Sequence, residues 1–355
     1  MFLKETIDRN PELVTFAQSL GLPDTYVIDV DTFVENAKKI KDAAKDIDCY
    51  FMLKQVGRNP YLAKKLMEID YPGCVAVDFR EALTMINNGI HICNVGHLVQ
   101  IPKALIKTII SARPDFVTCY SLDKINEIND AAKELGITQK ILIKVVDDDD
   151  ILYPGQEAGF KLDELIFPKF SNCEITGVTA FPCFLENEPT HNLETLFKAK
   201  EMLGVEHVNA PSCNCVEVAK SIQGSGITSI EPGHALTGTT PVPNQVEIPS
   251  VVYTTEVSHI YDNKSYIYGG GFYRRGHTKY ALVNSEIVNV EEPALDSIDY
   301  YFKLNKKFSI SSPVVMAFRF QIFVTRSQVA LVEGLHTGSP KVIGIYSSLG
   351  EKING

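Results

Sequence analysis

The sequence lacks several features that would place it in a special class of protein. No apolar run among its 355 residues approaches the roughly 18 residues of a membrane span. The first residues carry Lys4, Glu5, Asp8 and Arg9, where a secretory signal peptide would need an apolar stretch. Low-complexity segments are also missing. We therefore expect a globular, cytoplasmic protein with no membrane partner.

An excess of basic residues is missing as well. The chain has 34 Lys and Arg against 44 Asp and Glu, which gives a formal net charge of −10. A negative protein repels the phosphate backbone of DNA and RNA, so we expect no nucleic-acid partner. The phosphate of a small cofactor needs only a few local donors, and the charge does not exclude it.

Cysteine occurs eight times, but none follows Cys215. Several of the cysteines lie in apolar runs, as Cys49 does, which is typical of buried, reduced thiols in a cytosolic protein. Cys213 and Cys215 alone are too few for a zinc site, which usually has four ligands. The acidic run 147–150 has no His or Cys beside it and is typical of a solvated loop. We predict no metal site.

Between residues 25 and 235, short apolar runs alternate with segments of helical periodicity. We predict helices that begin after caps at Asp31 and Ser121. Eight such units within about 210 residues favour an α/β fold with a (β/α)₈ TIM-type barrel over an open doubly wound sheet. The predicted strands are 49–54, 74–78, 91–95, 116–120, 140–146, 175–181, 206–210 and 227–231.

The pattern changes after the proline-rich segment 241–244. Residues 251–260 and 314–324 read as strands, and helical periodicity is nearly absent. We therefore predict two domains, a barrel over 1–244 and a C-terminal all-β domain over 245–355.

In a (β/α)₈ barrel, the residues that end each strand line the mouth where active sites lie. Lys54 closes the apolar run that begins at Cys49, so its amine should emerge in this mouth. Desolvation there lowers the pKa of a lysine and makes its amine nucleophilic. A lysine that pairs with a carboxylate is the alternative. The predicted mouth residues are Lys54, Asp78, His97, Tyr120, Asp147, Phe181, Ser212 and Glu231.

The eighth strand ends in Glu231, and the chain then turns through Pro232, Gly233 and His234. The amides of Gly233 and His234, together with the hydroxyl of Ser212 after strand seven, predict a phosphate site, since barrels often bind phosphate after strands seven and eight. A carboxylate at this position would not stabilise the phosphate itself, but it could pair with a protonated ring nitrogen of the same cofactor. A Pro-Gly turn with a salt-bridged glutamate is the alternative.

A third feature lies in the β-domain, where three glycines follow Tyr268. Glycines let the backbone approach another surface closely, and a phenol can act as an acid or a base. The alternative is a strand-end turn with an aromatic plug.

Together these features resemble the fold-type III pyridoxal-phosphate enzymes, the group of alanine racemase and ornithine/diaminopimelate decarboxylase. The resemblance covers nearly the whole chain and implies pyridoxal 5'-phosphate as the cofactor. It makes Lys54 the Schiff-base lysine and Glu231 the partner of the pyridine nitrogen, as in the decarboxylases. It places Tyr268 at the second catalytic base of the racemases, which reaches the other subunit's site and implies a homodimer.

Several positions depart from the family pattern. Phe181 stands where the ring-stacking histidine is expected, and Arg58 replaces a tyrosine, as a charged substitute for the same phosphate contact. The arginine expected after strand five is missing. Met316 matches a racemase Met-Asp pair, with Arg319 nearby as a carboxylate clamp for the substrate.

The resemblance leaves the reaction open between two classes. Racemisation needs a base on each face of the substrate, which Lys54 and Tyr268 would supply. Decarboxylation in this family uses a cysteine of the C-terminal domain, and no cysteine follows Cys215, whereas Glu231 favours a decarboxylase. We predict an amino-acid racemase, with a decarboxylase as the alternative and a non-catalytic cofactor-binding protein as a third interpretation.

Overall fold

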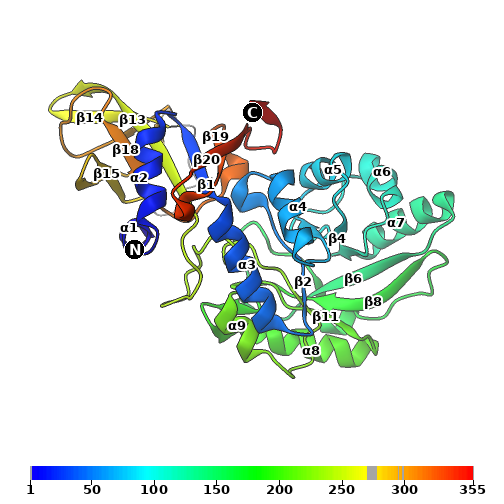
Figure 1. Ribbon diagram of the computed structural model, residues 1–355. Coiled ribbons are helices and arrows are strands. Elements are labelled where there is room, and N and C mark those ends of the chain that lie inside the picture. Colours follow the sequence, from blue (N-terminus) through cyan, green and yellow to red (C-terminus); the bar gives the residue numbers. More distant parts are fainter. Residues whose placement is uncertain (1, 270–277, 295, 298–299, 355) are drawn as a thin grey trace.

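The computed structural model describes residues 2–269, 278–294, 296–297 and 300–354. Two bodies lie side by side in Figure 1, a helix-wrapped barrel and a domain rich in strands. Within these described residues, no helix is both long enough and apolar enough to cross a membrane.

The barrel has eight parallel strands, and they coincide with the eight predicted ones. Their order is β2-β12-β11-β8-β6-β5-β4-β3. The sheet closes because Phe51, just after β2, bridges to Cys74 in β3. The Phe51 amide donates to Gly73 O at 3.1 Å and the Val75 amide donates to Phe51 O at 2.8 Å. The predicted fold class is confirmed. The strands are β2 (Asp48–Cys49), β3 (Cys74–Ala76), β4 (Ile92–Val95), β5 (Phe116–Cys119), β6 (Gln139–Val146), β8 (Cys173–Thr179), β11 (His207–Asn209) and β12 (Ser229–Ile230).

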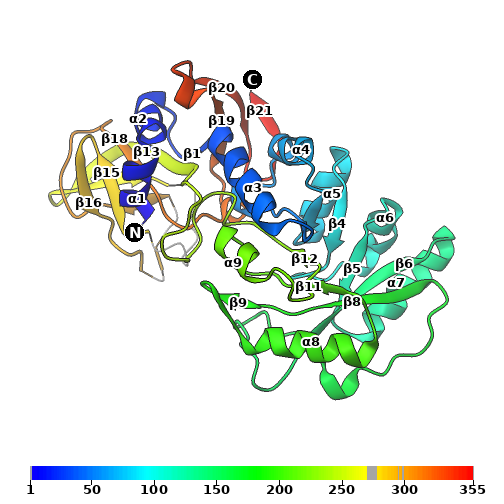
Figure 2. The ribbon, with the colours of Figure 1, turned by 60° about the horizontal axis from the view of Figure 1, so that its bottom comes forward.

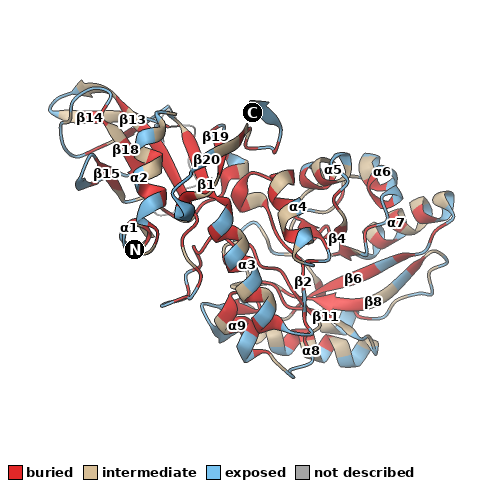
Figure 3. Ribbon diagram, in the orientation of Figure 1, coloured by how far each residue is buried: buried red, intermediate tan, exposed pale blue. Residues whose placement is uncertain are grey.

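Helices surround the barrel and turn one apolar face to it (Figures 2 and 3). In α7, Ile125, Ile128 and Ala132 are buried, and the Ser121 side chain accepts from the Lys124 amide at 3.3 Å, as a helix cap does. The helices of the barrel are α3 (Val30–Ala44), α4 (Pro60–Glu68), α5 (Phe79–Asn87), α6 (Ile106–Ser111), α7 (Leu122–Leu135), α8 (His191–Leu203) and α9 (Val216–Ser221).

The second body is built on a sheet whose main order is β16-β15-β18-β13-β1-β19-β20-β21, with β14 paired to β13 and β17 paired to β14. Helices α1 (Phe2–Arg9) and α2 (Pro11–Leu20) accompany it (Figure 1). Its strands are β1 (Thr25–Asp29), β13 (Val251–Tyr261), β14 (Lys264–Tyr268), β15 (Tyr280–Val283), β16 (Glu286–Asn289), β17 (Tyr301–Lys303), β18 (Pro313–Met316), β19 (Gln328–Glu333), β20 (Lys341–Tyr346) and β21 (Lys352–Asn354).

The N-terminal segment differs from the prediction that assigned residues 1–244 to the barrel. Strand β1 lies antiparallel to β13 and parallel to β19, inside the sheet of the β-domain. All five of its residues are buried, because both faces of the strand are covered: Val27 lies in the cluster of Leu13, and Tyr26 and Ile28 belong to the main core. The chain therefore starts in the β-domain and enters the barrel only with α3.

Two local predictions are also corrected. Asp29, not Asp31, caps α3, since its side chain accepts from the Thr32 amide at 3.2 Å. The predicted strand 314–324 ends at Met316, and a short 3₁₀ turn follows at Ile322–Val324. Phe318 and Phe320 are still buried, so the alternation in the sequence reflects packing rather than strand pairing.

Candidate active site

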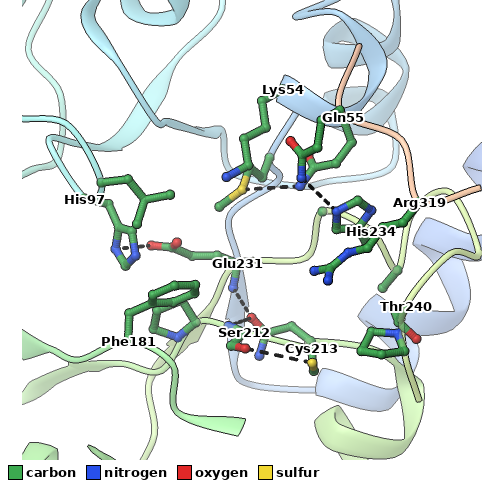
Figure 4. Close-up of a pocket in the computed structure, with 18 of the residues that line it drawn as sticks. Lys54, Gln55, His97, Phe181, Ser212, Cys213, Glu231, His234, Thr240 and Arg319 are labelled. Atoms are coloured by element: carbon green, nitrogen blue, oxygen red, sulfur yellow. Dashed lines mark hydrogen bonds and ion pairs between the residues drawn. The ribbon is translucent and has the colours of Figure 1, made fainter. Parts of the chain in front are cut away.

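A cavity of about 550 Å³ opens at the ends of the barrel strands, between the barrel and a segment of the β-domain. Figure 4 shows Lys54 and Gln55 on one side of it, Phe181 and Ser212 on the other, and Glu231 between them. The structure brings together eight of the predicted site residues in its lining, namely Lys54, His97, Phe181, Ser212, Glu231, Gly233, His234 and Arg319.

Lys54 reaches the cavity because the chain leaves strand β2 there and tightens into a 3₁₀ turn, Lys54–Val56. Gly57 ends this turn in the left-handed region with φ +71°. A side chain there would also press on Ile322 and Val329 at 3.2 Å, so glycine fits for both reasons. The turn brings the amine to the cavity, where burial raises the pKa of Glu231 and the positive charge of Lys54 only partly opposes that rise.

Glu231 is almost fully buried, with 4% of its surface exposed. Its Oε1 accepts hydrogen bonds from Asn209 Nδ2 at 2.7 Å and from Asn94 Nδ2 at 3.3 Å. Its Oε2 has no hydrogen-bond partner among the described residues. Burial raises the pKa of this carboxyl to about 7. A buried carboxylate with one oxygen held and the other open is suited to accept a hydrogen bond from a ligand.

His97 lies beside Glu231, with 3.6 Å between Nδ1 and the Glu231 Oε1. It is fully buried, and neither ring nitrogen forms a hydrogen bond in the described part of the chain. Burial, with the charges of Lys144 and Lys54, holds its pKa well below the usual value. The ring is therefore neutral, and the edge-to-face contact with Phe181 at 5.6 Å fits this state.

The loops after β11 and β12 form the polar side of the cavity. Ser212 and Cys213 both have positive φ, +106° and +49°, which non-glycine residues rarely adopt. The Ser212 hydroxyl donates to Phe184 O at 2.8 Å. At Gly233 a Cβ would lie 2.6 Å from Gln55 Nε2, so glycine lets the Gln55 side chain pack closely against this turn. His234 contacts Gln321 through Nε2 at 2.9 Å.

Six predicted residues lie outside the lining of this cavity, namely Asp78, Tyr120, Asp147, Arg58, Met316 and Tyr268. Arg58, which was expected to contact a phosphate, is 3% exposed and forms an ion pair with Asp78 at 2.7 Å. Met316 is fully buried in β18. Tyr268 lies at the end of β14, is 37% exposed, and lines a different depression. The glycine-rich segment after Gly269 is outside the described residues.

Sequence reasoning also missed several lining residues. Gln55 and Cys213 each adjoin a predicted residue, and that adjacency is the only signal that could have indicated them. Gln321 lies two residues from Arg319, and the alternation over 314–324 puts both on the same side, so a signal existed for it. No pattern marks Tyr153 and Phe323, which also line the cavity.

Comparison with known proteins gives the class. Residues 28–241 match the family described as "Alanine racemase, N-terminal domain", so the chain belongs to this family of fold-type III pyridoxal-phosphate enzymes. Residues 252–342 match the family described as "YhfX-like, C-terminal domain". The Escherichia coli (strain K12) protein YhfX, described as uncharacterized, is 42% identical over 99% of this chain and 100% of its own length.

Solved structures share the fold at low identity. Alanine racemase of Clostridium difficile 630, in complex with cycloserine, has a TM-score of 0.66 and 16% identity, covering 91% of this chain and 98% of its own. D-threonine aldolase from Filomicrobium marinum has a TM-score of 0.69 and 13% identity, covering 92% of this chain and 94% of its own. Diaminopimelate decarboxylase from Helicobacter pylori, complexed with L-lysine, has a TM-score of 0.66 and 15% identity, covering 92% of this chain and 93% of its own.

The family binds pyridoxal 5'-phosphate, and the cavity fits this cofactor. The open Oε2 of Glu231 can accept from a protonated ring nitrogen, which a neutral residue could not stabilise by charge. Ser212, Gly233 and His234 line the same cavity, where a hydroxyl and backbone amides could hold a phosphate. Lys54 supplies an amine on the same cavity.

Proposed function

We propose that this protein is a pyridoxal-phosphate-dependent amino-acid racemase that uses Lys54 and Tyr268 as its two bases. The observation that carries the proposal is the joint presence of Lys54 and the open oxygen of Glu231 in the lining of one cavity. When bound, the cofactor supplies the electron sink that makes the Cα proton of an amino acid removable. The chain's own residues then decide which bond breaks and where the proton goes.

Each lining residue has a role in this proposal. Lys54 holds the cofactor and moves a proton at the Cα of the substrate on one face. Glu231 keeps the ring nitrogen protonated, Ser212 and the backbone at Gly233 and His234 hold the phosphate, and Phe181 provides an aromatic face. Arg319, whose Nε is buried without a hydrogen-bond partner in the described part of the chain, binds the substrate carboxylate.

Tyr268 serves as the second base only if another copy of the chain brings it to the cavity. Within one chain it lies at the end of β14 beside Tyr301, with ring centroids 5.9 Å apart. Its partial exposure leaves the phenol accessible to a second copy. The proposal therefore includes a homodimer. The earlier expectations that placed Arg58 on the phosphate and Met316 on the substrate are not retained, because both side chains are committed elsewhere.

The first experiment tests cofactor binding at Lys54. We expect the purified protein to be yellow and to become covalently labelled at Lys54 when it is reduced with borohydride. Lys144 is a suitable control, because it is a buried lysine of the barrel and burial lowers its pKa to about 8. Lys54→Ala should abolish labelling and Lys144→Met should retain it. A colourless protein that borohydride leaves unlabelled would refute the proposal.

The second experiment tests the reaction. A panel of L-amino acids in heavy water should give the D-isomer with exchange of the Cα proton. Tyr268→Phe should abolish this, whereas Tyr261→Phe, at an exposed tyrosine of neighbouring β13, should not. Release of carbon dioxide and an amine would instead establish the decarboxylase, which the carboxylate at Glu231 favours.

A further inference from the structure

The far end of the barrel, where the strands begin, holds a cluster of metal-ligating side chains. His91 precedes β4, Cys93 is its second residue, and Asp115 precedes β5. The ring nitrogen of His91, the Cys93 sulfur and a carboxylate oxygen of Asp115 all lie within 4.8 Å of one another. The cavity described above is at the opposite end, where the same strand β4 leads to His97.

The three side chains are held in place by backbone hydrogen bonds between strands. His91 O accepts from the Cys74 amide at 3.0 Å, and the Asp115 amide donates to Ile92 O at 3.1 Å. Cys93 is fully buried and packs with Tyr50 and Val75 inside the barrel. The donor atoms therefore come from two adjacent strands with little freedom to separate, which is the preorganisation that a metal site needs.

A glycine makes the room for this cluster. A Cβ at Gly73 would lie 2.9 Å from the Cys93 sulfur and 3.0 Å from the His91 ring. The φ of Gly73 is not positive, so its backbone does not require glycine. The His91 carbonyl oxygen, 2.7 Å from that position, and the neighbouring ring and sulfur are together the reason that no side chain fits.

From these contacts we infer that His91, Cys93 and Asp115 bind one divalent cation of the zinc class at the base of the barrel. Imidazole nitrogen, thiolate and carboxylate are the three ligand types that Zn²⁺ accepts in proteins. Bonds of about 2.0–2.3 Å place the donors of a tetrahedral site about 3.3–3.6 Å apart. The His91–Asp115 contact, now 2.9 Å, needs to open by only a few tenths of an ångström.

Three protein ligands leave the fourth position of a tetrahedral site to water, because the cluster is partly exposed. His91 and Asp115 side chains are 39% and 44% exposed, so water reaches the outer side of the ion. The buried thiol loses its proton to solvent when the ion binds. The ion then joins β4 to β5 and replaces a partly exposed ion pair, which contributes little to stability by itself. The site is structural and separate from the proposed reaction.

Two features of the sequence hide this site. Asp115 is far from His91 and Cys93 along the chain, and a His-x-Cys pair alone offers two ligands. Only the pairing of β4 with β5 adds the third.

The test uses the full-length protein with its cofactor, stripped of metal by a chelator and titrated with Zn²⁺ and with Co²⁺. We expect one Zn²⁺ per chain and a rise in Tm on binding. The Co²⁺ form should have the absorption band of a cobalt–thiolate bond. Cys93→Ser should remove this band, and Cys119→Ser, a matched change of another buried strand cysteine, should keep it.

Asp115→Asn tests the site without disturbing the barrel interior, because this side chain is partly exposed. Its Zn²⁺ affinity should fall by more than the roughly 10–100-fold that loss of an outer-shell partner causes. Glu134→Gln, at an exposed ion pair with Lys107, should bind Zn²⁺ like the unaltered protein. Absence of a thiolate band, or equal Zn²⁺ affinity in Asp115→Asn and the unaltered protein, would overturn the inference. Cofactor absorbance should be the same in every variant, so the result is independent of the proposed racemase.

Discussion

Replacing Glu231 with glutamine should stabilise the cofactor-free protein in a pH-dependent way. Burial raises the pKa of this carboxyl from 4.5 to about 7. Between these two pH values the folded state binds more protons than the unfolded state, so the free energy of unfolding falls as the pH rises. At about 1.4 kcal/mol per pH unit, the full difference corresponds to about 3 kcal/mol above pH 7.

Glutamine removes this penalty because it stays neutral at every pH. Its carbonyl oxygen can still accept from Asn209 and Asn94, but its amide group takes the place of Oε2 and is left buried without an acceptor in the described part of the chain, which costs about 1 kcal/mol. We therefore expect Glu231→Gln to be about 2 kcal/mol more stable than the unaltered protein at pH 8. At pH 5 the same comparison should give a small loss.

The assay is denaturant unfolding of the cofactor-free protein at pH 5 and pH 8. Glu81→Gln is a matched control, because burial also raises the pKa of Glu81 to about 7 and Glu81 lies outside the cavity lining. Both variants should gain stability at pH 8, but only Glu231→Gln should lose cofactor affinity and activity. A stability difference that is the same at both pH values would falsify the reasoning.

Three further predictions concern the turn at Gly233, the buried ion pair of Arg58 with Asp78, and the Asn10 cap of α2. Gly233→Ala should weaken cofactor binding about tenfold, about 1.4 kcal/mol, because its Cβ would lie 2.6 Å from Gln55 Nε2. Titration with the cofactor measures this affinity. An unchanged affinity would contradict a role of the Gly233 turn in binding the phosphate. Asp78→Asn should destabilise the protein by about 3–5 kcal/mol by leaving the buried Arg58 charge unpaired, as a drop in Tm would show; a change below about 0.5 kcal/mol would mean that solvent reaches the pair. Asn10→Ala should cost about 1–2 kcal/mol in denaturant unfolding, since this side chain caps α2, and Asn10→Ser should recover most of that loss.

The eight barrel strands could be predicted because each is a short apolar run and most are followed by a helix, so that each run is marked locally. Strand β1 looks the same locally but pairs with β13 and β19, hundreds of residues away. Nothing within residues 25–29 distinguishes a barrel strand from a strand in the β-domain. The error in the predicted domain range therefore came from a non-local pairing and not from a misread element.

The site residues also fall into those that the local sequence locates and those that it does not. Lys54 and Glu231 could be located because the position at the end of a strand fixes where a side chain emerges. Arg58 could not, because its direction depends on a positive φ of +53° and on Asp78, which is 20 residues further along the chain. Gln55 and Cys213 enter the cavity through turns whose geometry one sequence does not reveal.

The position of Arg319 depends on this non-local sheet. Phe318 and Phe320, on either side of it, are buried against Tyr26 of β1, with ring centroids 6.4 and 5.5 Å apart. Because both neighbours face the aromatic cluster, the residue between them faces away, into the cavity. The first strand of the chain thus positions a cation at the mouth of a barrel to which it does not belong. The proposed substrate clamp is for this reason a property of the whole chain, and neither domain alone would hold Arg319 in place.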